Sequence, residues 1–135
     1  MVSDDPRMLR TVIDRASELA EKRGIVSVMV GLAAPEGDAL FPEFVAFCRS
    51  ALRMEDRIVS LTRERTLLHL ADVDGAAASE ILARLQTSFE QEFPSPLERA
   101  IDIHFFELTP EVAPVSVRTV LVSVFAPEAH EADPD

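Results

Sequence analysis

A predicted β-hairpin between Arg53 and Asp74 constrains the fold of this sequence more than any other feature. Two short apolar runs, Ile58–Leu61 and Leu67–Leu70, flank a charged four-residue segment, Thr62–Arg65. Short apolar runs joined by a few polar residues are typical of paired antiparallel strands and their turn. A helical pattern precedes this stretch and another follows it. We therefore expect the hairpin to lie at the centre of a small α/β domain.

Three elements are predicted before the hairpin. Asp4, Asp5 and Pro6 are typical of a helix start and Gly24 of a helix end. Between them, apolar residues recur at helical spacing: Leu9, Val12, Ile13, Ala16, Leu19 and Ala20. Ile25–Ala33 is apolar through nearly its whole length, which predicts a central strand covered on both faces. A loop at Ala34–Asp38 precedes a helix that begins at Pro42 and runs toward Met54.

Three further elements are predicted after the hairpin. Asp74 is a suitable cap for a helix over Gly75–Phe93, which Pro94 and Pro96 would end. Ile101, Ile103 and Phe105 alternate with Asp102, His104 and Phe106, which predicts a strand with one apolar face and a second, less apolar one. Val115–Phe125 is rich in β-branched residues, which favour a strand, but its apolar residues also recur at helical spacing. We expect a short helix with Ser116 near its cap, and a strand remains the alternative.

This order of elements is a helix, then βαββαβ, then a short helix. Such a chain closes most simply as an α+β fold with a ferredoxin-like antiparallel sheet. The first and third strands would pair in the centre, with the hairpin partner at one edge and the last strand at the other. Residues 1–125 would form a single domain. The acidic segment 126–135 lacks periodicity and is expected to be disordered.

Composition limits the classes of partner. The formal net charge of −11 argues against nucleic-acid binding, which depends on an excess of Lys and Arg. No apolar run is long enough to cross a bilayer, and one cysteine cannot form an internal disulfide. These features predict a cytoplasmic protein without membrane insertion.

Basic residues gather around the hairpin of this acidic chain. Residues 49–65 carry a local net charge of +2 and contain five arginines: Arg49, Arg53, Arg57, Arg63 and Arg65. A basic surface of this kind could receive phosphate groups or an acidic protein surface. A solvated helix end and loop would explain the same cluster.

A capped helix leads into an apolar strand, and a second helix leads to Arg53-Met54-Glu55-Asp56. A hairpin turn, the segment LLHLADVD and an Ala-rich helix follow. This order of segments resembles the GGDEF domain of bacterial diguanylate cyclases. In this family the pentapeptide Gly-Gly-Asp-Glu-Phe forms the hairpin tip, where this chain has Thr62-Arg63-Glu64-Arg65-Thr66. The resemblance implies the palm-type fold of nucleotide cyclases and a role in bacterial signalling.

The resemblance also implies that this chain has lost the cyclase activity of the family. The family's tip glycines let the backbone approach a triphosphate, which the side chains of Thr62 and Arg63 would obstruct. Its divalent metal needs carboxylates on the first strand and at the tip. No carboxylate lies between Ile25 and Pro35, and Glu64 is the only acidic residue at the tip. We therefore expect no enzymatic activity, no catalytic residue and no metal or other cofactor.

Arg53 and Asp56 match the family's inhibitory site, an Arg-x-x-Asp placed five residues before the signature. The implied ligand is cyclic di-GMP: an arginine can donate to the O6/N7 edge of guanine, and a carboxylate can accept from its N1 and N2 hydrogens. Chance is the competing explanation, because Arg99 and Asp102 form a second Arg-x-x-Asp to which the family gives no meaning.

Other candidate residues favour structural roles. His69, His104 and His130 are widely separated and, with one cysteine, do not have metal-ligand spacing. Cys48 is expected in the core.

Two functions remain after this comparison. The preferred one is a non-catalytic signalling or adaptor domain that contacts a protein partner through Arg49, Arg57, Arg63 and Arg65, with cyclic di-GMP as a regulatory ligand. The alternative is a dedicated cyclic-di-GMP receptor that uses Arg53 and Asp56. Homodimerisation is left open.

Overall fold

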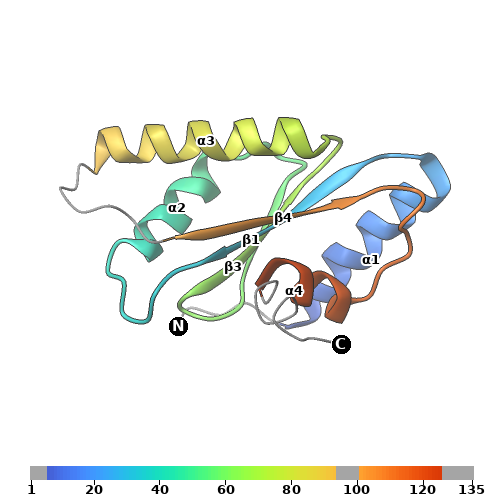
Figure 1. Cartoon of the computed structure of the whole chain (residues 1–135), viewed down its shortest axis with the longest axis horizontal. Coiled ribbons are helices and arrows are strands. Elements are labelled where there is room, and N and C mark those ends of the chain that lie inside the picture. The colour runs from blue at the N-terminus through green and yellow to red at the C-terminus, as the bar shows by residue number, and fades with distance from the viewer. Residues whose placement is uncertain (1–5, 94–100, 126–135) are drawn as a thin grey trace, which may run out of the picture.

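The computed structural model describes residues 6–93 and 101–125, which form one four-stranded sheet between two pairs of helices (Figure 1). The elements are α1 (Pro6–Arg23), β1 (Ser27–Ala33), α2 (Phe41–Ala51), β2 (Arg57–Ser60), β3 (Arg65–Leu70), α3 (Gly75–Glu92), β4 (Asp102–Leu108) and α4 (Val117–Phe125). The predicted cap at Asp4 and Asp5, the helix end at Pro94 and Pro96 and the tail 126–135 lie outside the described residues.

The sheet has the strand order β2-β3-β1-β4, with every neighbouring pair antiparallel. β1 and β3 are central, which confirms the predicted ferredoxin-like arrangement. Residues 27–32 of β1 are all buried, as expected for a strand with helices on both of its faces. The strand begins at Ser27 rather than at Ile25, because the Gly24 and Ile25 amides still donate to carbonyls of the last turn of α1.

Two apolar cores lie on opposite faces of the sheet. The α2/α3 core contains Val28, Val30, Leu32, Phe41, Phe44, Val45, Cys48, Leu68, Leu70, Ala78, Leu82, Leu85 and Phe89. The α1/α4 core contains Leu9, Ile13, Ala16, Ala20, Met29, Val59, Leu67, Leu108, Val120 and Val124. Alternate residues of each central strand therefore enter different cores, as the period of two in a strand requires.

The hairpin tip differs by one residue from the prediction. The loop is Leu61–Glu64 rather than Thr62–Arg65, because Arg65 pairs with Ala33 of β1 and so extends β3. The amides of Leu61 and Thr62 both donate to the Arg65 carbonyl and close this turn. Arg65 is thus held by the sheet.

The apolar face predicted for β4 is wrong at one position. Ile103 contacts the α2/α3 core, but Phe105 is 39% exposed. Phe106 and Leu108 instead pack in the α1/α4 core. β4 is an edge strand, so the helices cover its far residues less completely than those of β1.

Both predicted caps of the later helices are present. The Asp74 carboxylate accepts from the Ala77 amide at 2.9 Å at the start of α3. The Ser116 hydroxyl accepts from the Thr119 amide at 3.1 Å at the start of α4. Val117–Phe125 is therefore a helix, and the strand alternative for this segment is excluded.

Candidate functional site

The Arg53–Asp56 turn lies between the end of α2 and the start of β2. α2 ends at Ala51, after which Leu52 takes an extended conformation. The Asp56 amide then donates to the Arg53 carbonyl at 3.1 Å, which folds the four residues into a tight turn. This turn places the side chains of Arg53 and Asp56 in contact.

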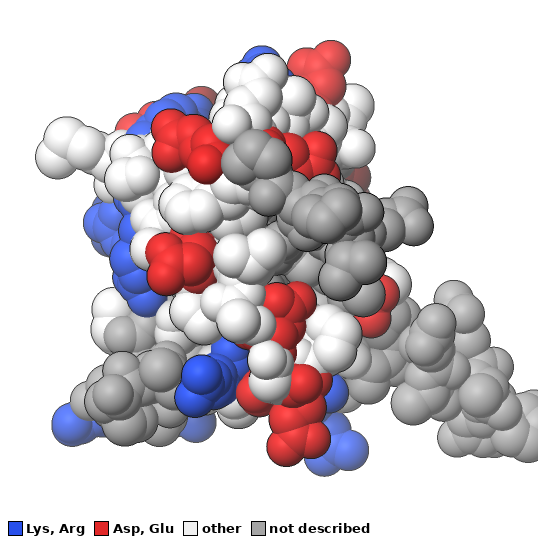
Figure 2. Space-filling model, turned by 90° about the vertical axis from the view of Figure 1, so that its left-hand side faces the viewer, with Lys and Arg blue, Asp and Glu red and all other residues white. Residues whose placement is uncertain are grey.

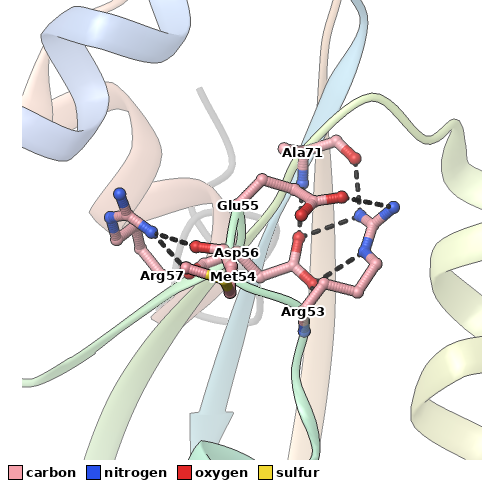
Figure 3. A network of polar contacts seen from close by, with 6 residues as sticks. All are labelled: Arg53, Met54, Glu55, Asp56, Arg57 and Ala71. Carbon is pink, nitrogen blue, oxygen red and sulfur yellow. Dashed lines mark hydrogen bonds and ion pairs between the residues drawn. The ribbon is translucent and has the colours of Figure 1, made fainter.

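Four hydrogen bonds end on the Asp56 carboxylate. Its Oδ2 accepts from the Arg53 amide at 3.2 Å and from Arg53 Nε at 3.0 Å. Its Oδ1 accepts from Arg53 Nη2 and from the Ala71 amide, both at 2.9 Å. The Asp56 side chain is only 2% exposed. Asp56 thereby connects the turn to the end of β3 (Figure 3).

The Arg53 guanidinium faces two environments. Its Nε and Nη2 point inward to Asp56, and Nη2 also donates to the Ala71 carbonyl at 2.6 Å. Its Nη1 forms a 3.3 Å ion pair with the exposed Glu55. The hydrogen bond to Asp56 is the main reason why the pKa of Arg53 is raised above its ordinary value. Arg53 therefore keeps its charge, and its side chain remains 44% exposed.

Arg57 stabilises the same turn from its other side. Its Nη1 donates to the carbonyls of Met54 and Asp56, at 2.6 and 3.0 Å. Figure 3 shows Arg53 and Arg57 extending in opposite directions from the turn. The structure thus gives Arg57 a local structural role, in addition to its place in the predicted partner surface.

A pocket of about 410 Å³ lies beside the Arg53–Asp56 turn, between α2 and α3. Its apolar walls come from Phe47, Ala51, Leu52, Ile81 and Leu85. Arg53, Asp56, Arg84 and Ser88 supply its polar groups. The volume falls within the range of about 300–1,000 Å³ that is common for small-molecule sites. The arrangement suits a flat, partly apolar ligand that carries hydrogen-bond acceptors or negative charge.

Arg84 is the charged pocket residue that sequence reasoning missed. It is exposed on α3, and Ile81, Leu85 and Ser88 lie three, one and four residues from it along the helix. A basic residue next to an apolar helical stripe is a weak signal by itself. Only the packing of α3 against α2 brings it toward Arg53, 31 positions away in the sequence.

The predicted basic cluster is divided between the two faces of the sheet. Arg49, on α2, donates to Ser60 Oγ at 3.1 Å. Arg65 instead lies 5.5 Å from the ring centroid of Phe125, which belongs to α4 on the opposite face. Arg63 is exposed in the tip loop. These arginines therefore surround one end of the hairpin and do not form one flat basic patch.

The face of the molecule in Figure 2 carries charges of both signs. Asp and Glu are spread among uncharged residues, while Lys and Arg gather toward the left and lower margins. On this face the protein offers no broad surface of a single sign. A partner that binds through charge would have to match a mixed pattern.

The remaining candidates lie in structural positions. Cys48 is fully buried in the α2/α3 core, and burial raises the pKa of its thiol to about 12. His69 is buried on β3, where desolvation lowers its pKa to about 4, and its Nε2 has no hydrogen-bond partner among the described residues. His130 and Arg99 lie outside the described ranges.

Two features are absent from the described part of the chain. No cluster of His, Cys, Asp and Glu in residues 6–93 and 101–125 could hold a metal ion. None of the helices in the same ranges is long and apolar enough to cross a bilayer.

Comparison with known proteins gives relatives by structure alone. No family model and no curated protein matches the sequence. PelD from Pseudomonas aeruginosa superposes with a TM-score of 0.70 at 17% identity, over 87% of this chain and 45% of PelD. The chain therefore spans less than half the length of the PelD chain. PelD has also been solved in complex with c-di-GMP.

Two GGDEF domains match over most of their own length. The FimX domain from Pseudomonas aeruginosa superposes with a TM-score of 0.69 at 12% identity. The match covers 92% of this chain and 90% of the FimX domain. The GGDEF domain of DgcB from Caulobacter crescentus was solved in complex with c-di-GMP. It superposes with a TM-score of 0.65 at 12% identity, and the match covers 89% of this chain and 81% of the DgcB chain. Since identities this low show the fold alone, the comparison establishes that this chain has the fold of GGDEF domains, as its sequence predicted.

Proposed function

We propose that this chain is a non-catalytic signalling domain that binds cyclic di-GMP in the pocket between α2 and α3. The observation that supports this most strongly is the position of that pocket. It opens directly beside the Arg53–Asp56 turn and adds Arg84 from a distant helix. Two structural relatives were solved with the same dinucleotide.

The chemistry of the pocket suits this ligand. Guanine is flat and presents O6 and N7 as acceptors, and each phosphate of a cyclic dinucleotide carries a negative charge. Arginine donates well to both kinds of group. Apolar walls such as Phe47 and Leu52 can cover the faces of a base.

The hairpin tip supports the non-catalytic part of the proposal. A side chain occupies each tip position where the family has glycine, namely Thr62 and Arg63. β1 carries no carboxylate, and the nearest tip acid is Glu64. A triphosphate with its divalent metal would lack both close backbone approach and paired oxygen ligands. Incubation with GTP and Mg²⁺ at high protein concentration is expected to yield no cyclic di-GMP.

Isothermal titration calorimetry with cyclic di-GMP tests the proposal. Wild type is expected to show saturable binding, which Arg84→Ala weakens at least about tenfold because a charged donor to the ligand is lost. Arg84 is exposed, so this substitution should not affect folding. Arg10→Ala is the matched control, since Arg10 lies on α1 beyond the opposite face of the sheet. Absence of heat from the wild type would refute the proposal.

A second candidate is the adaptor role, in which a protein partner contacts the hairpin tip. It is favoured by Arg63, exposed in the tip loop, and by Arg65, whose position over Phe125 connects the tip to α4. Replacing both arginines by glutamate should abolish recovery of that partner from a lysate. The pair Arg15→Glu and Arg23→Glu, on α1, provides the same charge change elsewhere. An unchanged set of recovered proteins would contradict the adaptor role of the tip.

A further inference from the structure

A second hollow lies on the α1/α4 side of the sheet, away from the pocket between α2 and α3. It has a volume of about 680 Å³ and is lined by α1 and α4, which pack on the same face of the sheet (Figure 1). The Val115 amide donates to the Ser17 hydroxyl at 3.1 Å, which fixes the start of α4 against α1. We call this hollow the α1/α4 groove.

α4 carries more apolar surface than the fold covers. Six of its nine residues are apolar: Val117, Val120, Leu121, Val122, Val124 and Phe125. Val120 and Val124 are the buried ones, whereas Val122 is 36% exposed. A helix that is apolar around most of its circumference is usually covered on more than one side. Val117, Leu121 and Val122 line the groove, so this side of α4 is suited to a further apolar contact.

Three charged side chains of the groove have no partner within the chain. Arg10 and Asp14 lie one turn apart on α1, and Arg118 lies in the first turn of α4. Residues four apart on a helix often form an ion pair. In the described ranges, however, none of these three side chains makes a hydrogen bond or an ion pair. The last residue of the lining, Ser116, is engaged as the cap of α4.

This arrangement matches the requirements of a contact between two copies of the groove. In a twofold-symmetric dimer, every contact between two different residues occurs twice with the roles exchanged. If two grooves face each other across such an axis, Asp14 of each copy meets Arg10 or Arg118 of the other copy. The apolar side chains of Leu121 and Val122 then cover their counterparts.

Charge also favours this surface for self-association. The chain carries a net charge of −11, so two copies repel each other over most of their surfaces. The three charged side chains of the groove sum to +1 and include both signs. Each of them therefore has an opposite charge to meet in the second copy.

We propose that two copies of this chain form a twofold-symmetric dimer through their α1/α4 grooves, with reciprocal ion pairs between Asp14 and the arginines Arg10 and Arg118. The groove and the α2/α3 pocket lie on opposite faces of the sheet. The dimer therefore leaves both α2/α3 pockets uncovered. Its formation does not depend on cyclic di-GMP, and a failure of either proposal leaves the other standing.

Sedimentation equilibrium of the wild type tests the dimer. As the concentration rises from about 1 μM to about 1 mM, the mass should rise from that of one chain toward that of two. The mass of one chain is 14.9 kDa. A mass that stays at this value up to about 1 mM would overturn the proposal.

Asp14→Arg tests the position of the interface. Each groove would then present three arginines to three arginines, so the Kd of the dimer should rise at least about tenfold. Glu90→Arg, on α3 beyond the opposite face of the sheet, makes the same change of net charge and should leave the Kd within about twofold. Equal effects of the two variants, or no effect of Asp14→Arg, would place the contact elsewhere and refute the proposal.

A charge exchange between two chains tests the reciprocal ion pairs. The double variant Arg10→Asp/Arg118→Asp places three acids in the groove and should also be monomeric alone. Mixed with Asp14→Arg, it should form a heterodimer, because each arginine again meets an acid. All three positions are exposed, so the variants should fold, and recovery of the dimer in the mixture would itself show that they do. If both variants have native circular dichroism and their mixture stays monomeric, the pairing is wrong.

Discussion

Gly31 of β1 lies directly beneath Val124 of α4: a Cβ at Gly31 would stand 2.7 Å from both the Cβ and the carbonyl oxygen of Val124. This is closer than carbon atoms can approach without displacement. The absence of a side chain at Gly31 therefore lets α4 pack on the central strand and complete the α1/α4 core. The last helix thus depends on one residue near the middle of the sheet.

Gly31→Ala should destabilise the protein by about 1–3 kcal/mol, because the added methyl group meets backbone as well as side-chain atoms. Chemical denaturation gives the free energy of unfolding. Gly75→Ala is the matched control, since the nearest atom to its new methyl group would be a Glu107 oxygen at 3.8 Å, an ordinary contact. Equal stability of the two variants would contradict the close packing of α4 on β1.

Asp74→Ala should cost about 0.5–2 kcal/mol, because the Ala77 amide loses its cap at the start of α3. Asp74→Asn keeps a side-chain oxygen in the same place and should retain most of the stability. Thermal unfolding of both variants measures the difference. If alanine and asparagine were equally tolerated, the hydrogen bond to Ala77 would have no energetic role.

His69 should make the protein sensitive to mild acid. Desolvation lowers the pKa of His69 from an ordinary value near 6.5 to about 4, while nearby Asp56 favours protonation and Arg57 opposes it. The unfolded chain therefore takes up a proton near pH 6.5 that the folded chain does not take up until about pH 4. The free energy of unfolding falls as pH falls through this window, by about 2 kcal/mol between pH 7 and pH 5.

His69→Met removes the titrating group and fills the same buried space. Its free energy of unfolding should depend less on pH between 7 and 5 than that of the wild type, and urea denaturation at the two pH values measures this. An identical pH dependence in the two proteins would show that His69 is not the group responsible.

Glu55→Gln should tighten the binding of cyclic di-GMP by up to about fivefold. The carboxylate of Glu55 competes with the ligand for Arg53 Nη1, and an exposed ion pair of this kind is worth about 0.2–1 kcal/mol. Glu111→Gln makes the same change of net charge at an exposed position outside the pocket lining and should leave the Kd unchanged. Weaker binding by Glu55→Gln would mean that Glu55 contacts the ligand favourably.

The fold could be predicted because its signals are local. Apolar spacing identified α1, α2 and α3, and the continuous apolar run ending at Ala33 identified the central strand. For Val115–Phe125 the spacing favoured a helix but left a strand as the alternative. The prediction was wrong at Phe105 because exposure of an edge strand depends on how far the helices extend over it. It was wrong by one residue at the hairpin tip because Arg65 is held by pairing with Ala33, a contact with a distant strand.

The candidate site was only partly predictable. The Arg-x-x-Asp spacing drew attention to Arg53 and Asp56 as a ligand-binding pair, and the structure joins the two side chains by hydrogen bonds. The spacing could not indicate that Ala71 would occupy a remaining lone pair of Asp56, since that depends on where β3 ends. Nor could it indicate Arg84, which reaches the pocket through the packing of α3 on α2.

Chemical-shift mapping tests the central claim most directly. In ¹H–¹⁵N NMR spectra, saturating cyclic di-GMP should shift the amides of residues that line the α2/α3 pocket, from Phe47 to Arg53 and from Ile81 to Ser88. The amides of Ser116 to Val122, beyond the opposite face of the sheet, should not move. Spectra without change at millimolar ligand, or changes confined to Ser116–Val122, would contradict a cyclic-di-GMP site between α2 and α3.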